Sequence, residues 1–309
     1  MDAASSILVL ETYVLETHKT SATLVFYGFY VLLFAIAIFT LHRRQTAGKT
    51  FLLAASWTLF LVGTVQTILC IMIAVLSVQI VSTLAVPPGS TTEISALLRK
   101  QDGLDSASEA IFVLNVFLTD LLFLCRCYLI YARQWRVILF PSFLIFLTSM
   151  AAIISLGTSS QSTPLGQKVH LVTAVAGYGI GLLGNIVLMA LTASRLWWMS
   201  RASAHTYLHM TLKNRYSTTI SIILESGAIY CICAGLLAVA LLSSGNSGKF
   251  YRTMEGIAFQ AVNIAPTLTV VRVGLGHNIV DSVGTGSSPG LALRGKTSPK
   301  VLECGGIQG

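Results

Sequence analysis

The sequence has few charged residues, and this scarcity limits the class of protein. Only 10% of its 309 residues are Asp, Glu, Lys or Arg, whereas a soluble globular domain carries about 25%. Hydrophobic residues make up 54% of the chain, and the mean hydropathy is +0.76. A chain so poor in charge cannot cover a water-exposed surface. The composition therefore excludes an ordinary soluble domain.

Features of a secreted, disulfide-bonded protein are also missing. The six cysteines lie in or beside apolar runs or near the C-terminus, so they do not form a disulfide framework. The chain has no Asn-x-Ser/Thr sequon and begins without a basic, cleavable leader. We therefore expect neither N-glycosylation nor a removed signal peptide.

The sequence does contain long apolar runs. Each is long enough to cross about 30 Å of hydrocarbon as a helix at 1.5 Å per residue. They predict an all-α, seven-helix transmembrane bundle over residues 1–277 and a disordered cytoplasmic tail over residues 278–309, which is rich in Gly and Ser. The predicted spans cover about 23–41, 51–76, 107–131, 137–157, 169–194, 217–242 and 254–275.

The distribution of basic residues predicts the orientation of this bundle. Most Lys and Arg fall in the odd-numbered loops and the C-terminal flank, and Arg126 lies inside a span. The opposite side holds only Lys19, Arg99, Lys100, Lys168, Lys249 and Arg252. Cytoplasmic loops collect Lys and Arg, so the N-terminus is expected outside and the C-terminus in the cytoplasm. The net charge of +8 then favours contact with anionic inner-leaflet lipids rather than nucleic acid.

Three sequence motifs resemble catalytic or nucleotide-binding signatures, but their context is wrong. A phosphate-loop pattern at 290–297 and a hydrolase elbow pattern at 286–290 both lie in the tail, without the strand and helix that either chemistry needs. The glycines Gly179, Gly181 and Gly184 lie inside a span. Together with Gly177, they predict a small-residue face for close helix packing. We therefore expect no enzyme activity and no cofactor.

His205 and His209 are spaced i, i+4, which would place them on one face of a helix as a metal pair. No third ligand is evident nearby, and the surrounding loop is basic. We interpret them as two solvated histidines, and we predict no metal site.

Charged residues inside the spans are the candidate functional residues, because a charge in hydrocarbon is costly. Asp120 and Arg126 are six residues apart and point in different directions on a helix, so each needs its own partner. Asn115, Thr119 and Arg126 share one stripe of that helix. Glu225 lies at a depth similar to that of Arg126, so we predict an interhelical ion pair or a shared network between Arg126 and Glu225.

A second polar group is expected near the bilayer midplane, formed by Asp120, Gln66, Asn185 and Asn263. This cluster has two interpretations, a site for a ligand, ion or proton and a buried hydrogen-bond network that fixes helix packing. Pro266 follows Asn263 and should free a backbone carbonyl and kink the seventh span.

Three stretches around these residues carry a family resemblance. They are Asp120 with Arg126-Cys-Tyr-Leu-Ile-Tyr131, Glu225-Ser-Gly-Ala-Ile-Tyr230, and Pro266-Thr-Leu-Thr-Val-Val-Arg272-Val-Gly-Leu-Gly276. The sequence resembles, over roughly residues 21–276, a group of seven-span integral membrane proteins of basidiomycete fungi, with Tyr131 standing where Trp is expected. The resemblance implies a fungal seven-helix membrane protein and brings no assigned activity.

Three functions remain open at this point. The leading hypothesis is a receptor-like sensor in which Arg126 and Glu225 hold one state and a small-molecule ligand acts near Asp120. The topology resembles that of G-protein-coupled receptors, although the sequence lacks the Asp-Arg-Tyr and Asn-Pro-x-x-Tyr motifs. The alternatives are a small-molecule or ion transporter or channel that uses the midplane site, and a purely structural membrane protein. The lipid bilayer is the expected partner, and the plasma membrane the expected location.

Overall fold

The computed structural model describes residues 3–42, 49–85, 91–131, 134–159, 163–202, 209–243 and 248–285. These residues form seven α-helices, and six of the helices are long and apolar enough to cross a membrane. The helices are α1 (Ala3–His42), α2 (Lys49–Ala85), α3 (Thr91–Ile130), α4 (Trp135–Ser159), α5 (Pro164–Ala202), α6 (His209–Leu242) and α7 (Gly248–Thr285). The predicted all-α class and membrane character are thus confirmed.

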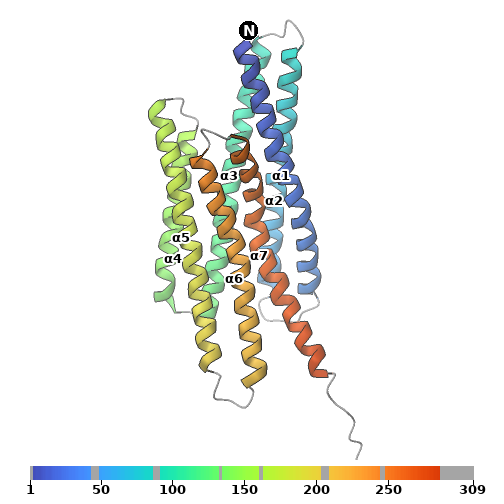
Figure 1. The fold of residues 1–309 in the computed structure, drawn as a ribbon, viewed down its shortest axis with the longest axis vertical. Coiled ribbons are helices and arrows are strands. Elements are labelled where there is room, and N and C mark those ends of the chain that lie inside the picture. Colours follow the sequence, from blue (N-terminus) through green and yellow to red (C-terminus); the bar gives the residue numbers. More distant parts are fainter. Residues whose placement is uncertain are drawn as a thin grey trace, which may run out of the picture.

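The helices run up and down in chain order around a ring. Each helix packs against its neighbour in sequence, and α7 closes the ring by packing along α1. The N-terminal end of α1 and the C-terminal end of α7 lie at opposite ends of the bundle (Figure 1). Both helices therefore run in the same direction, which lets residues at their beginnings meet.

Helix α7 is the most buried of the six membrane-crossing helices, whereas α4 is the least buried. In the most apolar stretch of α7, 72% of the residues are buried, against 17% in α4. Helix α7 also contacts α2 and α3, and its hydropathy is the lowest of the six long helices. A helix surrounded by other helices needs no lipid-compatible surface, so α7 can carry polar side chains that α4 cannot.

Several helices extend beyond the predicted spans. Helix α3 begins at Thr91, so most of the loop expected before residue 107 is helical, and α1 begins twenty residues before its predicted span. In Figure 1 the ends of α1, α2 and α3 project together beyond the other helices. Hydropathy indicates only which residues are stable in the hydrocarbon of a membrane. Helices that pack against one another can continue beyond the hydrocarbon.

Helix α7 extends to Thr285, so residues 278–285 are helical rather than part of a disordered tail. The two rejected tail motifs, at 286–290 and 290–297, lie outside the described residues. His205 also lies outside them, as does the side chain of His209.

The glycines of α5 contact α4. A Cβ added at Gly177 would lie 3.5 Å from Ala151, one at Gly181 would lie 3.3 Å from Thr148, and one at Gly184 would lie 3.6 Å from Leu144. Gly179 has nothing within 4 Å. The packing interpretation of these glycines is therefore confirmed, and the face that packs is formed by the i, i+4, i+7 set.

Candidate functional site: a carboxylate-lined cavity and a buried charge cluster

A cavity of about 150 Å³ opens between α3, α4, α5, α6 and α7. A cavity of this size is large enough to hold a small organic molecule. Most of its lining is apolar or aromatic, and the polar groups include the carboxyl groups of Glu109, Asp120 and Glu255 together with His170. The cavity therefore combines an apolar body with a few fixed polar groups, as small-molecule sites do.

The cavity is confined to one half of the bundle. Its lining begins near the starts of α5 and α7 and at Glu109 in the middle of α3, and it reaches Asp120 on α3, Leu182 on α5 and Val262 on α7. Helix α3 continues for ten residues beyond Asp120, about 15 Å at 1.5 Å per residue. A void beside Arg126, at the other end, measures only about 10 Å³. The void on that side is therefore much smaller than the cavity.

Asp120 lies at the deep end of this cavity and is buried, with 4% of its surface exposed. Its Oδ1 atom accepts a hydrogen bond from Nδ2 of Asn185 at 3.4 Å. The same Nδ2 atom of Asn185 also donates to the carbonyl oxygen of Gly181 at 3.1 Å. Because one amide N–H₂ serves both acceptors and the bond to Asp120 is long, Asn185 solvates the carboxyl group only weakly.

The other two residues of the expected midplane cluster lie elsewhere. Gln66 on α2 is fully buried and donates to Oγ of Ser108 on α3 at 2.8 Å. Asn263 on α7 is also fully buried and packs against Gly63 of α2, where a Cβ would lie 2.8 Å from its Nδ2 atom. The structure thus joins Asp120 to Asn185, whereas the described contacts of Gln66 and Asn263 are with other residues of α2, α3 and α7.

Arg126 is directed toward α7. Its Nη2 atom donates to the carbonyl oxygen of Pro266 at 3.3 Å, and its guanidinium lies 5.9 Å from the centre of the Phe123 ring. The side chain of Glu225 is exposed on α6. The described contacts of Arg126 therefore involve α3 and α7, and an Arg126–Glu225 pair stays a prediction.

Pro266 explains a second contact between α3 and α7. Proline has no N–H, so the carbonyl oxygen of Val262, four residues earlier, loses its helical partner. The hydroxyl of Thr119 on α3 donates to this oxygen at 3.4 Å. Thr119 and Arg126 are seven residues apart, about two turns, so one face of α3 holds α7 on both sides of the proline. The predicted stripe that includes Thr119 and Arg126 does face the bundle.

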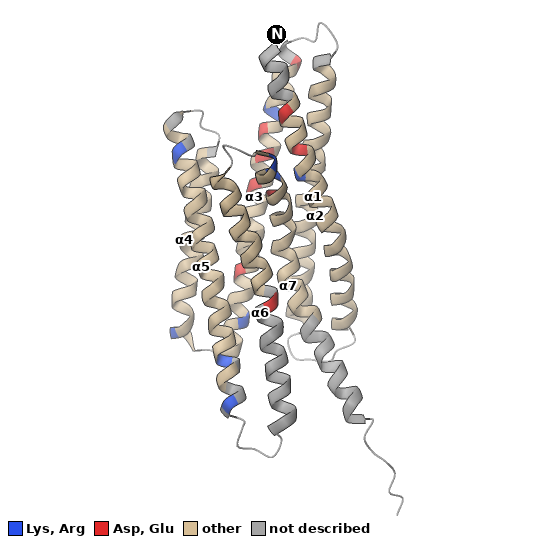
Figure 2. Cartoon of the chain, viewed as in Figure 1, with Lys and Arg blue, Asp and Glu red and all other residues tan. Residues whose placement is uncertain are grey.

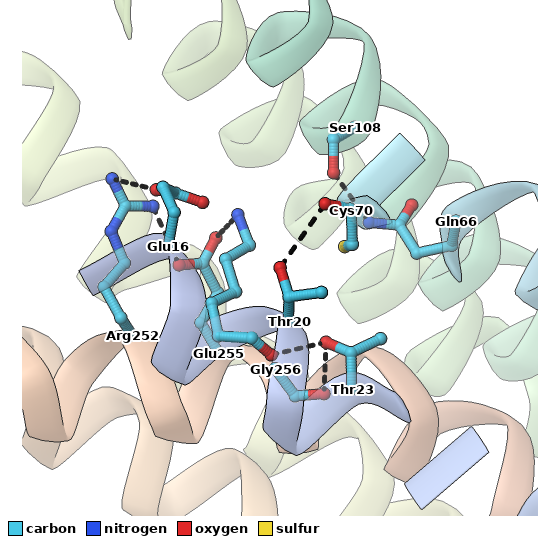
Figure 3. Close-up of polar contacts among 10 residues, drawn as sticks. Glu16, Thr20, Thr23, Gln66, Cys70, Ser108, Arg252, Glu255 and Gly256 are labelled. Carbon is cyan, nitrogen blue, oxygen red and sulfur yellow. Dashed lines mark hydrogen bonds and ion pairs between the residues drawn. The ribbon is translucent and has the colours of Figure 1, made fainter. Parts of the chain in front are cut away.

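A cluster of four buried or half-buried charges links the beginnings of α1 and α7, and we call it the charge cluster (Figure 3). The ammonium of Lys19 lies 3.0 Å from Glu255, and the guanidinium of Arg252 lies 3.1 Å from Glu255 and 3.5 Å from Glu16. Glu16 and Lys19 are each 2% exposed and Glu255 is 7% exposed. Two carboxylates and two cations meet here, so their charges cancel.

Close helix packing holds this charge cluster in place. A Cβ at Gly256 would collide with the carbonyl oxygen of Lys19, so the backbones of α1 and α7 can approach this closely only at glycine. The hydroxyl of Thr23 donates to the carbonyl oxygens of Lys19 at 2.9 Å and of Gly256 at 3.4 Å. Thr20 adds a bond to the carbonyl oxygen of Cys70 on α2 at 3.3 Å (Figure 3).

Sequence reasoning missed the charge cluster, because Lys19 and Arg252 fall outside the predicted spans and were used only to predict the orientation. A signal was present in the spacing. Glu16 and Lys19 are an i, i+3 pair of opposite sign, and so are Arg252 and Glu255. Each pair presents both charges on one helix face, and Gly256 beside the second pair marks a place of close approach.

Comparison of this chain with protein-family models, with curated proteins and with solved structures found no match. The geometry of the cavity and of the charge cluster therefore carries the functional argument.

Proposed function

We propose that the chain is a seven-span receptor-like sensor of the plasma membrane that binds a small ligand in the cavity above Asp120. Its N-terminus would lie outside and its C-terminus in the cytoplasm, following the distribution of Lys and Arg. In this orientation the cavity faces outward. The observation that carries the proposal is the confinement of the cavity to the half of the bundle at which α3, α5 and α7 begin.

The signal would pass through α7 at Pro266. Val262 lines the cavity, and its carbonyl oxygen accepts the hydrogen bond of Thr119, the neighbour of Asp120. Two turns further along α3, Arg126 binds the carbonyl oxygen of Pro266. A ligand that engages Asp120 acts directly beside the point where α7 lacks a backbone hydrogen bond. Binding can thus shift α7 between two bends that differ in the Arg126 contact.

A transporter is the second candidate, and the Asp120–Asn185 pair near the middle of the bundle favours it. Transport requires that this site be reached from both faces in turn. The cavity lies on one side of Asp120 and the void beside Arg126 measures only about 10 Å³, which supports a sensor over a transporter.

A screen that reads binding, conformation and flux separately tests the proposal. The purified protein in lipid nanodiscs is exposed to a panel of amines, amino acids and sugars, and hydrogen exchange is followed by mass spectrometry for α7 around Pro266. At least one compound should change the exchange rate about threefold or more in the wild type and leave Asp120→Asn unchanged, because the ligand alters the opening of this segment.

The same compounds are then tested for uptake into sealed proteoliposomes. The sensor proposal expects no uptake that depends on Asp120. Uptake that depends on Asp120 would show that the protein is a transporter and would overturn the sensor proposal. Identical behaviour of the wild type and Asp120→Asn in every assay would leave a structural membrane protein.

A further inference from the structure

The charged groups of the cavity are unbalanced. No Lys or Arg is present among the described residues that line it, whereas Glu109, Asp120 and Glu255 contribute carboxyl groups. Glu255 is already paired with Lys19 and Arg252. Two acidic groups, Glu109 and Asp120, therefore face the cavity with no Lys or Arg among its described lining residues, and His170, which also lines the cavity, interacts electrostatically with Glu109.

The spacing of these two groups is set by α3. Glu109 and Asp120 are eleven residues apart, which on an α-helix is about 16 Å along the axis and about 20° in rotation. Both side chains therefore leave α3 in nearly the same direction, and both line the cavity. The cavity has one carboxyl group at its outer end and one at its deep end.

The wall that α3 and α7 form between the two carboxyl groups is apolar. Phe112 and Val116 continue the same side of α3, and the ring of Phe259 on α7 packs against that of Phe112 at an angle of 45°, with ring centres 4.8 Å apart. Such a wall favours a hydrocarbon chain and disfavours a charge in the middle of the ligand, because an ion would lose its hydration there.

The mouth of the cavity also carries an excess of negative charge. Four acidic side chains and two basic ones, together with His170, interact electrostatically around Asp105 and Glu109, and with His170 neutral this leaves two negative charges in excess. The acidic residues are Glu16, Asp105, Glu109 and Glu255, and the basic ones are Lys19 and Arg252. Figure 2 shows acidic residues on α1 and α3 at this end together with some basic ones, and at the opposite end of α4 and α5 the coloured residues are basic. Such a field attracts cations toward the opening.

We propose that the ligand of this cavity is an elongated organic dication, a linear diamine with one ammonium group at each end. This inference rests on the proposed function in that both use the same cavity. One ammonium binds Asp120, a residue that is 4% exposed and that, among the described side chains, accepts one long hydrogen bond, from Asn185. The other binds Glu109, and the methylene chain lies along Phe112, Val116 and Phe259.

The geometry also sets the length of the ligand. An ammonium–carboxylate hydrogen bond of about 2.8 Å at each end leaves roughly 10–11 Å between the two nitrogens, the span of an extended chain of about eight methylenes. Shorter diamines reach only one carboxyl group, and longer ones must fold. A monoamine of equal length leaves one carboxyl group without a counter-charge.

The experiment measures binding of linear diamines from four to twelve carbons to the full chain in nanodiscs, with monoamines of matched length. Affinity should reach a maximum near eight carbons and exceed that of octylamine about tenfold or more. Asp120→Asn and Glu109→Gln should each reduce the diamine to the affinity of the monoamine. Glu93→Gln, an exposed acidic residue on α3 that does not line the cavity, should change nothing.

The chain-length profile of the wild type needs no variant, so it decides the question even if a substitution impairs folding. A flat profile, or octylamine binding as tightly as the diamine, overturns the inference. A loss in Glu93→Gln equal to that in Glu109→Gln also overturns it, since attraction to the acidic surface would then explain the binding.

The failures of the two proposals can be told apart. Suppose that diamines bind with the expected length profile but do not change hydrogen exchange around Pro266. The proposed ligand class would then stand, and the sensor proposal would be wrong. A response at Pro266 to a neutral or anionic compound, with no diamine binding, would retain the sensor and remove the dication.

Discussion

Two regions of this bundle bury carboxyl groups in different ways. In the charge cluster, Glu16 and Glu255 meet Lys19 and Arg252 at 3.0 to 3.5 Å, and a close helix contact encloses all four. Asp120 has one amide donor at 3.4 Å and an adjoining cavity. A buried carboxylate that is matched by cations stabilises one packing arrangement. One that faces a cavity without a cation is available to bind a ligand.

The two regions are linked, because Glu255 belongs to the charge cluster and also lines the cavity. Lys19 lies 5.0 Å from the centre of the Phe259 ring, which lines the cavity as well. The comparison therefore predicts different losses of stability for similar substitutions. The losses should be large in the charge cluster and small at Asp120.

Removing one charge of the cluster should have the largest effect. Lys19→Met leaves the buried Glu255 with Arg252 alone, and we expect a loss of about 3 kcal/mol in the free energy of unfolding. Lys19→Met with Glu255→Met leaves the Arg252–Glu16 pair and should regain more than half of that loss. Denaturant titration in mixed micelles measures both, with the exposed Lys168→Met as the matched control. A single-substitution loss below about 1 kcal/mol would show that the charge cluster is not a stabilising contact.

A larger side chain at Gly256 should cause the next largest loss of stability. Gly256→Leu places a side chain against the backbone of α1, and overpacking of this kind costs about 1–3 kcal/mol. Gly179→Leu is the matched control on α5, because nothing lies within 4 Å of its Cβ position. The same micelle titration applies. Equal stability of the two variants would contradict the close approach of α1 and α7.

The hydrogen bond from Thr119 to Val262 tests whether α3 supplies the donor that Pro266 removes from the backbone of α7. Thr119→Val should cost about 1 kcal/mol, because it leaves the carbonyl oxygen of Val262 without its donor. In a Pro266→Ala background the backbone N–H returns, and the same substitution should cost less than half as much. A double-mutant cycle of unfolding free energies measures the difference. An equal cost in both backgrounds would separate the hydrogen bond from the proline.

Asp120→Asn should have the smallest effect on stability. Asn has nearly the same shape as Asp and removes a carboxyl group that has no cation beside it, so the free energy of unfolding should change by less than about 0.5 kcal/mol. The matched change in the charge cluster, Glu255→Gln, should destabilise strongly. A loss above about 1.5 kcal/mol in Asp120→Asn would instead assign Asp120 to the packing of the bundle.

Much of the fold could be predicted from composition and apolar runs. The all-helical class, the membrane character and the position of each helix along the chain follow from the rule that backbone in hydrocarbon must satisfy its own hydrogen bonds. The limits of α1 and α3 could not be predicted, because beyond the hydrocarbon a helix is stabilised by its neighbours and not by its own hydropathy. The glycines of α5 were readable because their i, i+4, i+7 spacing places them on one face.

The candidate site could be predicted only in part. Asp120 stood out because a lone carboxyl group in an apolar run is costly, and the freed carbonyl before Pro266 followed from the missing N–H. The sequence could not predict which side chains contact one another. Gln66 and Asn263 have the same burial and chemistry as Asn185, and only helix rotation decides which of them reaches Asp120.

The sequence by itself determined that the chain forms apolar helices and which polar residues enter them, because both are properties of single segments in hydrocarbon. The tertiary structure alone decided the partners. It paired Lys19 with Glu255 across two helices, turned Arg126 toward Pro266, and left Asp120 facing a cavity. These choices depend on how helices far apart in sequence rotate and approach, and that packing is a property of the whole bundle.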